Sequence, residues 1–370
     1  MTVSFKHTTK RIIAIIISLL LVASFSYIMG NYLVLVENGL KVYKPSAVNL
    51  VPEYKDGAWS MTTPAAITVK ASELNIEKTV DDTQAGVGDT VNFTVVADVP
   101  QYPASAKNTT YKISDTPSAG LTVNETTIKV YGVKGTDETE LTAGFAKTNG
   151  FTLDFTYATI KTYDKVKVTY SATVDTDAVV TTGNTNTATL TYTNNPYSIT
   201  DSTKDDTDTE TVYTYAIKIT KIDKTSQSAL TGAEFKLYSD ESCSTQIKLT
   251  GANGAYTVDP TSGSDAAVAV ASDGTLTVNG LDVGTYYLKE TKAPAEYNLP
   301  GSAFSVTVAD DDKDGKVDDD GIVEQNIENS KGFQLPTTGG MGTLIFTIAG
   351  IVLIGGGLVL FVIARRKARA

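Results

Sequence analysis

The chain has 370 residues, of which 41% are apolar, and its net charge is −11. The two ends hold seven of the 31 basic residues and none of the 42 acidic ones, so the middle carries 24 basic against 42 acidic residues, a net charge of −18. This length allows two or three domains of ordinary size, and the acidic balance disfavours nucleic acid and anionic membrane as partners.

Histidine and cysteine each occur only once, as His7 and Cys243. A Ser-His-Asp or Cys-His catalytic site, a Cys/His metal cluster and an internal disulfide therefore cannot be assembled from this chain. We expect no cofactor and no bound metal. A hydrolase built on paired carboxylates is the enzyme class that stays open.

The N-terminus has the pattern of a secretory signal peptide, which we expect over residues 1–30. Lys6, Lys10 and Arg11 precede an apolar stretch from Ile12 to Met29. Small residues at Ser24 and Ser26 offer a cleavage site, but the residues that follow stay apolar. An uncleaved N-terminal anchor is therefore the alternative.

Between Leu74 and Ser330 the sequence indicates β-structure almost throughout, because Thr, Val, Ile and Tyr alternate over short runs separated by Gly, Asn, Asp and Pro. One such strand, Val166 to Val174, places every second residue on an apolar face. Regular short strands favour an all-β fold of two tandem immunoglobulin-like β-sandwiches. A polar stretch from Asn194 to Thr211 is the best candidate boundary, and we expect the domains at 73–213 and 214–331.

Each block opens with a lysine on the apolar face of its first strand. In a strand, residues two apart share a face, and this parity directs Lys78 and Lys221 into their own cores. An unpaired buried ammonium is costly enough to deprotonate or to find a partner. The apolar residues of matching parity are Leu74, Ile76 and Val80 in the first block and Tyr215, Ile217 and Ile219 in the second.

Amides and acids of inward parity lie later in each block. Asn186 and Asp115 do so in the first block, and Asn329 and Glu290 in the second. Burial lowers the pKa of a lysine and raises that of an acid, so the amine can attack the amide carbon while the acid shuttles protons. The product is a Lys–Asn isopeptide bond and ammonia. An ordinary polar cluster or a snorkelling lysine is the alternative.

Four motifs of the second block resemble a CnaB-type domain. They are Lys221 to Lys224, Leu230 to Tyr238, Tyr287 to Pro294 and Asn329. The resemblance implies that Lys221 is the bonding lysine, Glu290 the catalytic acid and Asn329 the amide.

The first block resembles the isopeptide-forming, CnaA-like D2 domain of sortase-assembled pilins. The similarity is carried by Lys78 to Val80, Gly88 to Val91, Tyr111 to Pro117 and Gly183 to Ala188. It implies that Lys78, Asp115 and Asn186 take the bonding roles. Asn184 has the same parity as Asn186 and is the alternative amide.

The C-terminus resembles the sorting signal of Gram-positive surface proteins. Leu335, Pro336, Thr337, Thr338 and Gly339 precede an apolar segment at 343–364 that is long enough to span a bilayer, and a basic cytoplasmic tail at 365–370 follows. The resemblance implies that a sortase cysteine attacks the bond between Thr338 and Gly339. The membrane would then be a partner only through the C-terminal helix before sorting.

Residues 31–72 are too short for a domain of ordinary size, and the resemblance implies that they are a remnant of an N-terminal pilin domain. Backbone pilins carry the lysine that joins subunits just before the middle domain, which favours Lys70. Tyr43-Lys44-Pro45 permutes the usual Tyr-Pro-Lys signature, so Lys44 ranks second.

The segment Asp310 to Gly321 follows the early part of an EF-hand loop. Gly321 stands where a bidentate Glu belongs, and no flanking helices are expected, so a solvated hairpin turn is the better interpretation and weak calcium binding the alternative. Cys243 lies among polar residues and has no expected role.

Taken together, the sequence predicts a secreted, cell wall-anchored pilin subunit of a fimbrium that is a substrate of sortase and not an enzyme. Its expected partners are sortase, neighbouring pilin subunits, a peptidoglycan precursor and a host surface ligand. A monomeric wall-anchored adhesin of the same architecture and a carboxylate-based wall hydrolase are the alternatives.

Overall fold

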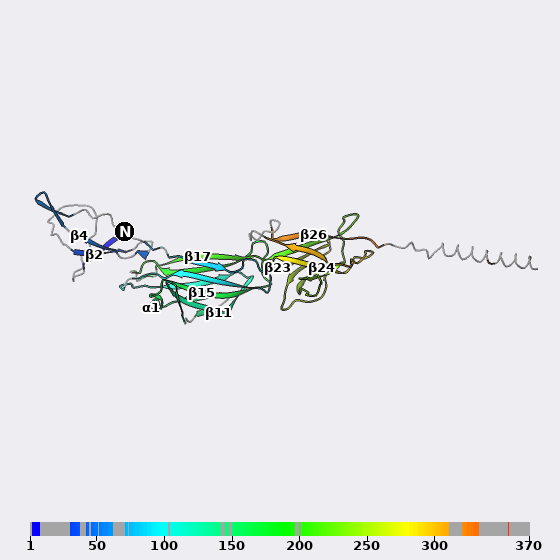
Figure 1. The fold of residues 1–370 in the computed structure, drawn as a ribbon, viewed down its shortest axis with the longest axis horizontal. Coiled ribbons are helices and arrows are strands. Elements are labelled where there is room, and N and C mark those ends of the chain that lie inside the picture. The colour runs from blue at the N-terminus through cyan, green and yellow to red at the C-terminus, as the bar shows by residue number, and fades with distance from the viewer. Residues whose placement is uncertain are drawn as a thin grey trace, which may run out of the picture.

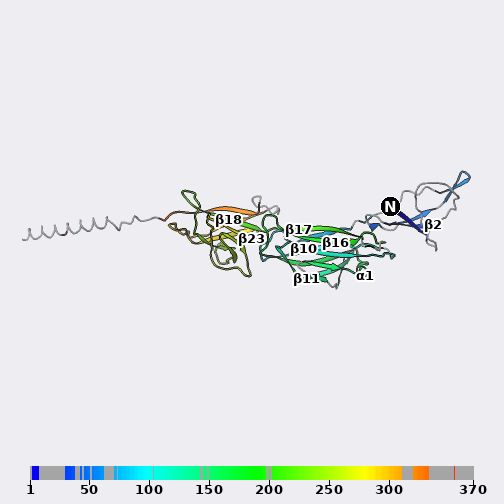
Figure 2. The ribbon, with the colours of Figure 1, turned by 180° about the vertical axis from the view of Figure 1, so that it is seen from behind.

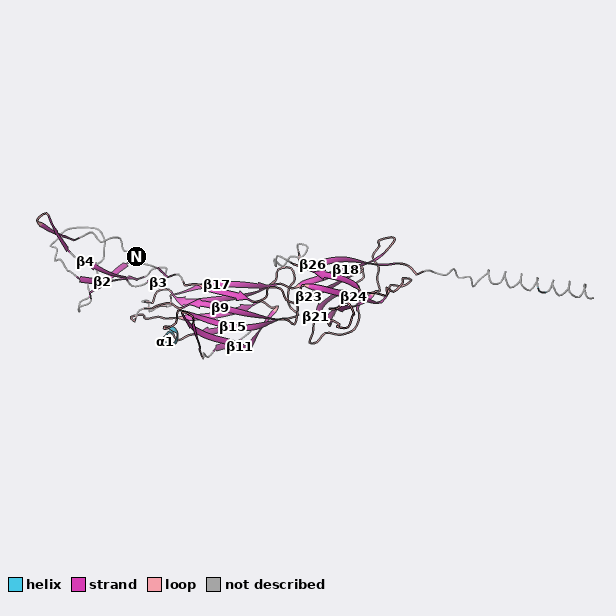
Figure 3. Cartoon of the chain, in the orientation of Figure 1, coloured by secondary structure: helices cyan, strands magenta, loops and turns pink. Residues whose placement is uncertain are grey.

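The computed structural model describes residues 2–7, 30–37, 42–43, 46–50, 52–61, 71–72, 74–102, 104–141, 145–147, 150–196, 200, 202–310, 320–332 and 354. Two β-sandwiches follow one another along the long axis of the molecule (Figure 1). Nearly all of the described elements are strands (Figure 3), and the one helix with defined bounds among them is the single turn α1 (Tyr157–Ile160). The expected all-β fold of two sandwiches is therefore confirmed.

Short paired strands precede the sandwiches. β2 (Gly30–Glu37) pairs with β1 (Thr2–His7) and β4 (Ser46–Leu50), β3 (Val42–Tyr43) with β7 (Ala71–Ser72), and β5 (Pro52–Lys55) with β6 (Ala58–Met61). The first residues of the predicted signal segment are thus a strand, while its apolar stretch lies outside the described residues. Within the described ranges no helix has the length and apolarity to cross a bilayer, and the segment 343–364 lies outside them except for Ile354.

The first sandwich has two five-stranded sheets. One contains, in spatial order, β13 (Phe145–Lys147), β14 (Phe151–Asp154), β10 (Tyr111–Pro117), β16 (Asn184–Thr193) and β17 (Thr203–Val212). The other contains β12 (Asp137–Glu140), β11 (Leu121–Lys134), β15 (Lys165–Val174), β9 (Thr90–Asp98) and β8 (Ile76–Val80). Seen from behind, β10, β16 and β17 run side by side (Figure 2).

The second sandwich packs a five-stranded sheet on a four-stranded one. The larger sheet contains β20 (Leu249–Ala252), β21 (Ala255–Val258), β23 (Thr275–Leu281), β18 (Tyr215–Asp223) and β26 (Ile322–Asn329). The smaller contains β22 (Val268–Ala269), β19 (Glu234–Tyr238), β24 (Gly284–Lys292) and β25 (Phe304–Val308). The first and last strands of this domain, β18 and β26, are parallel neighbours.

Strand parity decides what enters the core. In β15 the residues of one parity are buried and those of the other are mostly half-buried, as the sequence predicts for Val166 to Val174. β9 and β16 show the same alternation. The inward faces of the two sheets therefore form an apolar core in which any polar inward residue needs an internal partner.

The second half of the polar stretch that the sequence suggested as a domain boundary is a strand of the first sandwich. Residues Thr203–Val212 form β17 against β16. Inward-facing carboxylates of β17 accept hydrogen bonds from the neighbouring edge strand β8. Asp206 accepts one from the backbone N–H of Ile76 at 3.2 Å, and Asp208 accepts one from the backbone N–H of Lys78 at 2.7 Å. The aspartates of β17 thus satisfy backbone N–H groups at the unpaired edge of β8.

A loop of the first sandwich, residues 83–88, inserts into the second. The backbone N–H of Ala85 donates to the carbonyl of Tyr213 at 3.0 Å, and that of Val87 donates to Gly280 at 2.9 Å. Val87 is only 7% exposed. A Cβ on Gly280 would lie 2.5 Å from Val87 Cγ2, so this contact requires glycine.

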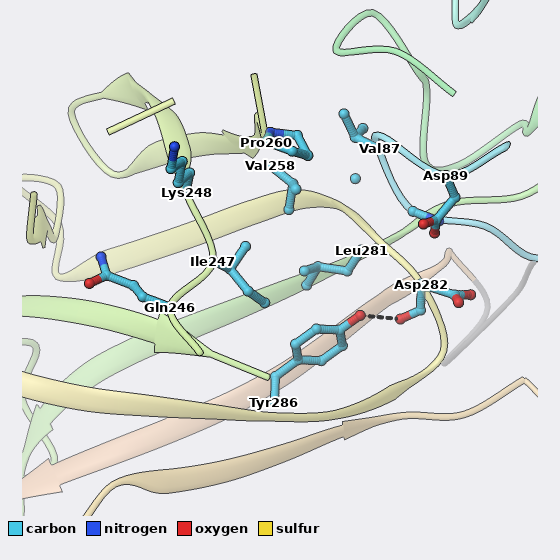
Figure 4. Close-up of a pocket in the computed structure, with 12 residues that line it drawn as sticks. Val87, Asp89, Gln246, Ile247, Lys248, Val258, Pro260, Leu281, Asp282 and Tyr286 are labelled. Atoms are coloured by element: carbon cyan, nitrogen blue, oxygen red, sulfur yellow. Dashed lines mark hydrogen bonds between the residues drawn. The ribbon is translucent and has the colours of Figure 1, made fainter. Parts of the chain in front are cut away.

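Side-chain hydrogen bonds hold the same junction. Gln84 Nε2 donates to the Tyr215 hydroxyl at 3.1 Å and to the carbonyl of Asp310 at 2.9 Å, and the Tyr215 hydroxyl donates to the Asp310 carboxylate at 2.6 Å. Beside the loop lies a cavity of about 360 Å³ between the sandwiches (Figure 4). Its lining includes Val87 from the first sandwich and Leu281 from the second.

We predict that Val87→Asp loosens the junction while both sandwiches stay folded, because a carboxylate placed at this contact loses its hydration and each sandwich keeps its own core. Small-angle scattering should show a broader range of interdomain orientations, and limited proteolysis should cut faster between Val212 and Tyr215. Val179→Asp is the matched control, since Val179 is 48% exposed. Unchanged scattering and proteolysis in Val87→Asp would mean that the inserted loop does not stiffen the junction.

Candidate functional site

The first sandwich gathers a lysine, an acid and an amide in its core. Lys78 comes from β8, Asp115 from β10 and Asn186 from β16, and each is at most 3% exposed. In the β10–β16 ladder Asp115 lies opposite Ala188, and Pro117 lies opposite Asn186. The acid and the amide therefore both face inward and lie two positions apart along the ladder. The structure thus brings together the three residues that parity directs inward.

A tyrosine hydroxyl lies at the centre of this cluster. Lys78 Nζ forms an ion pair with Asp115 Oδ2 and also donates a hydrogen bond to the hydroxyl of Tyr170 on β15. That hydroxyl donates to Asp115 Oδ2 at 2.7 Å and accepts from Asn186 Nδ2 at 3.1 Å. Lys78 Nζ also lies 4.8 Å from the ring centroid of Phe93, a cation–π distance.

Burial shifts the pKa values of Lys78 and Asp115 in opposite directions. It lowers the pKa of Lys78, against the raising effect of the adjacent Asp115. It raises the pKa of Asp115, against the lowering effect of Lys78 and of the Tyr170 hydrogen bond. Both shifts favour a neutral amine beside a protonated acid, since the apolar core penalises both charges.

The second sandwich builds an equivalent cluster from different strands. Lys221 lies on β18, Glu290 on β24 and Asn329 on β26, and each is at most 2% exposed. Because β18 and β26 are parallel neighbours, with Lys221 opposite Ile327, the lysine and the amide lie two positions apart along the same ladder.

The contacts of this cluster join all three groups directly. Lys221 Nζ donates to Asn329 Oδ1 at 2.8 Å and to the carbonyl of Ile327 at 2.9 Å. Asn329 Nδ2 donates to Glu290 Oε1 at 2.7 Å. The other Glu290 oxygen lies 3.8 Å from Lys221 Nζ, so the carboxyl group has one oxygen toward each partner.

The pKa directions repeat those of the first cluster. Burial lowers the pKa of Lys221, while Glu290 opposes this shift. Burial raises the pKa of Glu290, while Lys221 and the hydrogen bond from Asn329 oppose it. A neutral amine, a carboxamide and an acid that can carry a proton between them are the three components needed for amide exchange with loss of ammonia.

Asn184 is also buried, but it has another role. Its Oδ1 accepts from the backbone N–H of Val179 at 2.9 Å, and its Nδ2 donates to the carbonyls of Val179 and Val212, both at 3.2 Å. The two bonds to Val179 hold the turn between β15 and β16, and the third joins Asn184 to β17. Asn186, by contrast, shares the Tyr170 hydroxyl with Lys78.

The remaining predicted residues fall mostly outside the described ranges. Lys70, Lys44 and the motif from Leu335 to Gly339 lie outside them. In the Asp310 to Gly321 segment, residues 311–319 also lie outside. Within the part of the chain that the structure describes, no group of three or more His, Cys, Asp or Glu could hold a metal ion.

Tyr170 is the site residue that the sequence interpretation missed. Its parity places it with Val168 and Ala172 on the inward face of β15, where a tyrosine is indistinguishable from an ordinary core aromatic. Only the convergence of β15 with three other strands reveals that its hydroxyl contacts every member of the cluster.

Three family models match separate parts of the chain. Residues 87–196 match the Gram-positive pilin backbone subunit 2, Cna-B-like domain. Residues 215–321 match the SpaA prealbumin-like fold domain, and residues 327–368 match the LPXTG cell wall anchor motif.

Two curated proteins are similar in sequence. The trypsin-resistant surface T6 protein of Streptococcus pyogenes serotype M6 is 24% identical over an alignment 403 residues long, which covers 84% of this chain and 71% of that protein. The fimbrial subunit type 1 of Actinomyces viscosus is 30% identical over 153 residues, which cover 37% of this chain and 28% of that protein.

Solved structures share the fold. The T6 backbone pilin of serotype M6 Streptococcus pyogenes superposes with a TM-score of 0.57 at 23% identity, over 76% of this chain and 62% of that one. This chain therefore spans less than two thirds of that structure. The group B streptococcus pilus 2b backbone protein superposes with a TM-score of 0.51 at 29% identity, over 70% of this chain and 99% of that one.

The two asparagines of the first sandwich should respond differently to removal. We predict that Asn186→Ala abolishes ammonia loss from this sandwich, because the reacting carboxamide is gone. Asn184→Ala should keep the ammonia loss but lower the stability by about 1–3 kcal/mol, because it leaves buried backbone groups without partners. Peptide mass mapping and thermal unfolding measure the two effects. Ammonia loss that survives in Asn186→Ala and disappears in Asn184→Ala would reverse the assignment.

Proposed function

Because residues 87–196 match a Gram-positive pilin backbone domain and residues 327–368 match an LPXTG cell wall anchor motif, we propose that the chain is a pilin backbone subunit. It would form a surface pilus whose subunits are each reinforced by two intramolecular Lys–Asn isopeptide bonds. The anchor motif marks the chain as a sortase substrate held at the cell wall. The observation that carries the proposal is the pair of fully buried Lys–acid–Asn clusters, one in each sandwich.

The second cluster supports a direct mechanism. Lys221, whose pKa burial lowers, would attack as the neutral amine on the side-chain carbonyl carbon of Asn329, whose oxygen it already contacts at 2.8 Å. The carboxyl group of Glu290 accepts a proton from the amine and delivers a proton to the departing nitrogen, which it contacts at 2.7 Å. The new C–N bond replaces the bond to Nδ2, and ammonia leaves with the proton lost by the amine.

Each bond would join residues 108 positions apart. For a loop of about this length the chain-entropy model gives roughly 4–5 kcal/mol of stabilisation, which native-state strain reduces. In the second sandwich the bond would connect β18 and β26, the first and last strands of the domain. Tension along the chain would then pass from strand to strand through a covalent bond.

Assembly follows from the sorting motif. Sortase would cut between Thr338 and Gly339 and pass the Thr338 carbonyl either to Lys70 of a neighbouring subunit or to a peptidoglycan precursor. Joining through two different surfaces is heterologous, and heterologous contacts that do not close propagate as filaments. A pilus built in this way presents its subunits to a host surface ligand, which supports a role in adhesion.

The intact mass of the recombinant ectodomain, residues 73 to 331, should be lower than the sequence mass by two molecules of ammonia. Each predicted bond, Lys78 to Asn186 and Lys221 to Asn329, expels one. Mass spectrometry of folded protein measures this loss, and tryptic mapping assigns each bond to its sandwich. Folded protein with the unmodified sequence mass would falsify the proposal.

The two acids provide matched controls for this measurement. Asp115→Ala should restore one ammonia mass in the first sandwich alone, and Glu290→Ala should do so in the second alone. Each variant should also lose resistance to heat and protease in the affected domain. Normal bond yield without the acid would remove Asp115 or Glu290 from its catalytic role.

We predict that Lys70→Ala abolishes the high-molecular-weight ladders of cell-wall extracts, because the acceptor amine for Thr338 is lost. Lys44→Ala, the second-ranked lysine, is the matched control and should leave the ladders intact. The opposite pattern on denaturing gels would move the linkage to Lys44. A wild-type strain without ladders would favour a monomeric wall-anchored adhesin.

A further inference from the structure

The two clusters connect the acid to the amide in different ways. In the second sandwich Glu290 itself accepts the hydrogen bond of the amide nitrogen, at 2.7 Å. In the first sandwich the hydrogen bond of the Asn186 amide nitrogen goes to the Tyr170 hydroxyl, at 3.1 Å, and this hydroxyl donates to Asp115 at 2.7 Å, although Asn186 also lies close enough to Asp115 to lower its pKa. Aspartate is one methylene shorter than glutamate, and the Tyr170 hydroxyl lies between the shorter acid and the amide.

We propose that Tyr170 is a further catalytic residue of the first sandwich, which relays the proton between Asp115 and the leaving nitrogen of Asn186. This inference rests on the isopeptide chemistry proposed above. It concerns only the first cluster, because Glu290 contacts its amide without an intermediary.

The relay balances in atoms and protons. Asp115 begins protonated and gives its proton to the Tyr170 oxygen as Tyr170 passes its own proton to Nδ2 of Asn186. Lys78 forms the new bond to the side-chain carbon of Asn186 and gives up one proton to the Asp115 carboxylate, with which it is paired. The bond from carbon to Nδ2 breaks, ammonia departs, and both Asp115 and Tyr170 end in the protonation states in which they began.

Packing fixes the phenol in the position that this step requires. The Tyr170 ring stacks on Phe93 with centroids 5.5 Å apart and meets Phe151 edge-on at 5.0 Å. Burial also raises the pKa of Tyr170 far above its ordinary value, and the adjacent Asp115 adds to this shift. The Tyr170 hydroxyl therefore releases its proton only as it receives another one. A proton relay requires this behaviour.

The test uses Tyr170→Phe, which keeps the ring and removes the hydroxyl. Full-length chain is made by cell-free translation, synthesis is stopped, and timed samples are digested and analysed by mass spectrometry for both cross-linked peptides. Bond formation between Lys78 and Asn186 should slow by about 100-fold, within the range of general acid–base catalysis. The bond between Lys221 and Asn329 in the same chain should form at its normal rate.

Tyr111→Phe is the matched control. Tyr111 is fully buried in the same core, but its hydroxyl donates to the carbonyl of Ala97 at 3.3 Å, away from the cluster. It should leave both rates unchanged. A Tyr111→Phe variant as slow as Tyr170→Phe would overturn the relay in favour of a general packing effect.

Rescue separates the relay from a structural role. The double variant Tyr170→Phe with Asp115→Glu should recover most of the rate, because the longer acid can reach the amide directly, as Glu290 does. A folded double variant that stays slow would overturn the relay. If Tyr170→Phe does not fold, 3,5-difluorotyrosine at position 170 keeps the packing and changes the acidity of the phenol; an unchanged rate would then overturn it.

Two outcomes distinguish this inference from the proposed function. Wild-type chain without a Lys78–Asn186 peptide would reject the cross-link itself, and the relay with it. Wild-type chain with the peptide, formed at the same rate in Tyr170→Phe, would reject the relay and leave the cross-link in place.

Discussion

The burial of one lysine ammonium in each apolar core is the constraint on which the rest of the structure depends. A charged amine in such a place costs several kcal/mol unless it is paired or loses its proton. In each sandwich the strands place an acid and an amide next to this lysine. The pKa of the lysine falls and that of the acid rises, because the apolar core penalises the charge on each of them.

The two sandwiches place these reactants in different topological positions. In the second, Lys221 and Asn329 lie on adjacent parallel strands of one sheet, so a bond between them would fasten the first strand to the last. In the first, Lys78 and Asn186 lie in opposite sheets, so a bond would fasten one sheet to the other. The same chemistry would therefore oppose strand sliding in one domain and sheet separation in the other.

Polar groups outside the clusters also have structural roles. The aspartates of β17 accept hydrogen bonds from backbone N–H groups of β8, the strand that carries Lys78. They help to hold this lysine in place although β8 has a ladder partner on one side only. At the junction, Gln84 and the inserted loop continue the hydrogen bonding from one sandwich to the next, which favours a stiff and extended molecule.

The sequence by itself determined the all-β class, the two-sandwich organisation and the inward direction of Lys78, Asp115, Asn186, Lys221, Glu290 and Asn329, because a strand has a period of two and its parity can be counted. Parity cannot say which inward residues meet. Asn184 and Asn186 share a face, and only the turn that Asn184 holds separates their roles. Tyr170 resembles any core aromatic until four strands converge on its hydroxyl.

Tertiary structure also determined secondary structure and burial at places where local sequence propensity predicts something different. Asp-rich sequence disfavours strands, so Asn194 to Thr211 is the best candidate boundary from the sequence, yet its second half is β17, whose aspartates accept hydrogen bonds from β8. The burial of the loop at residues 83–88 depends on Gly280 and other residues almost 200 positions away, which no local pattern indicates. Local pattern thus determines the direction of a side chain, whereas its partner depends on contacts that only the folded chain creates.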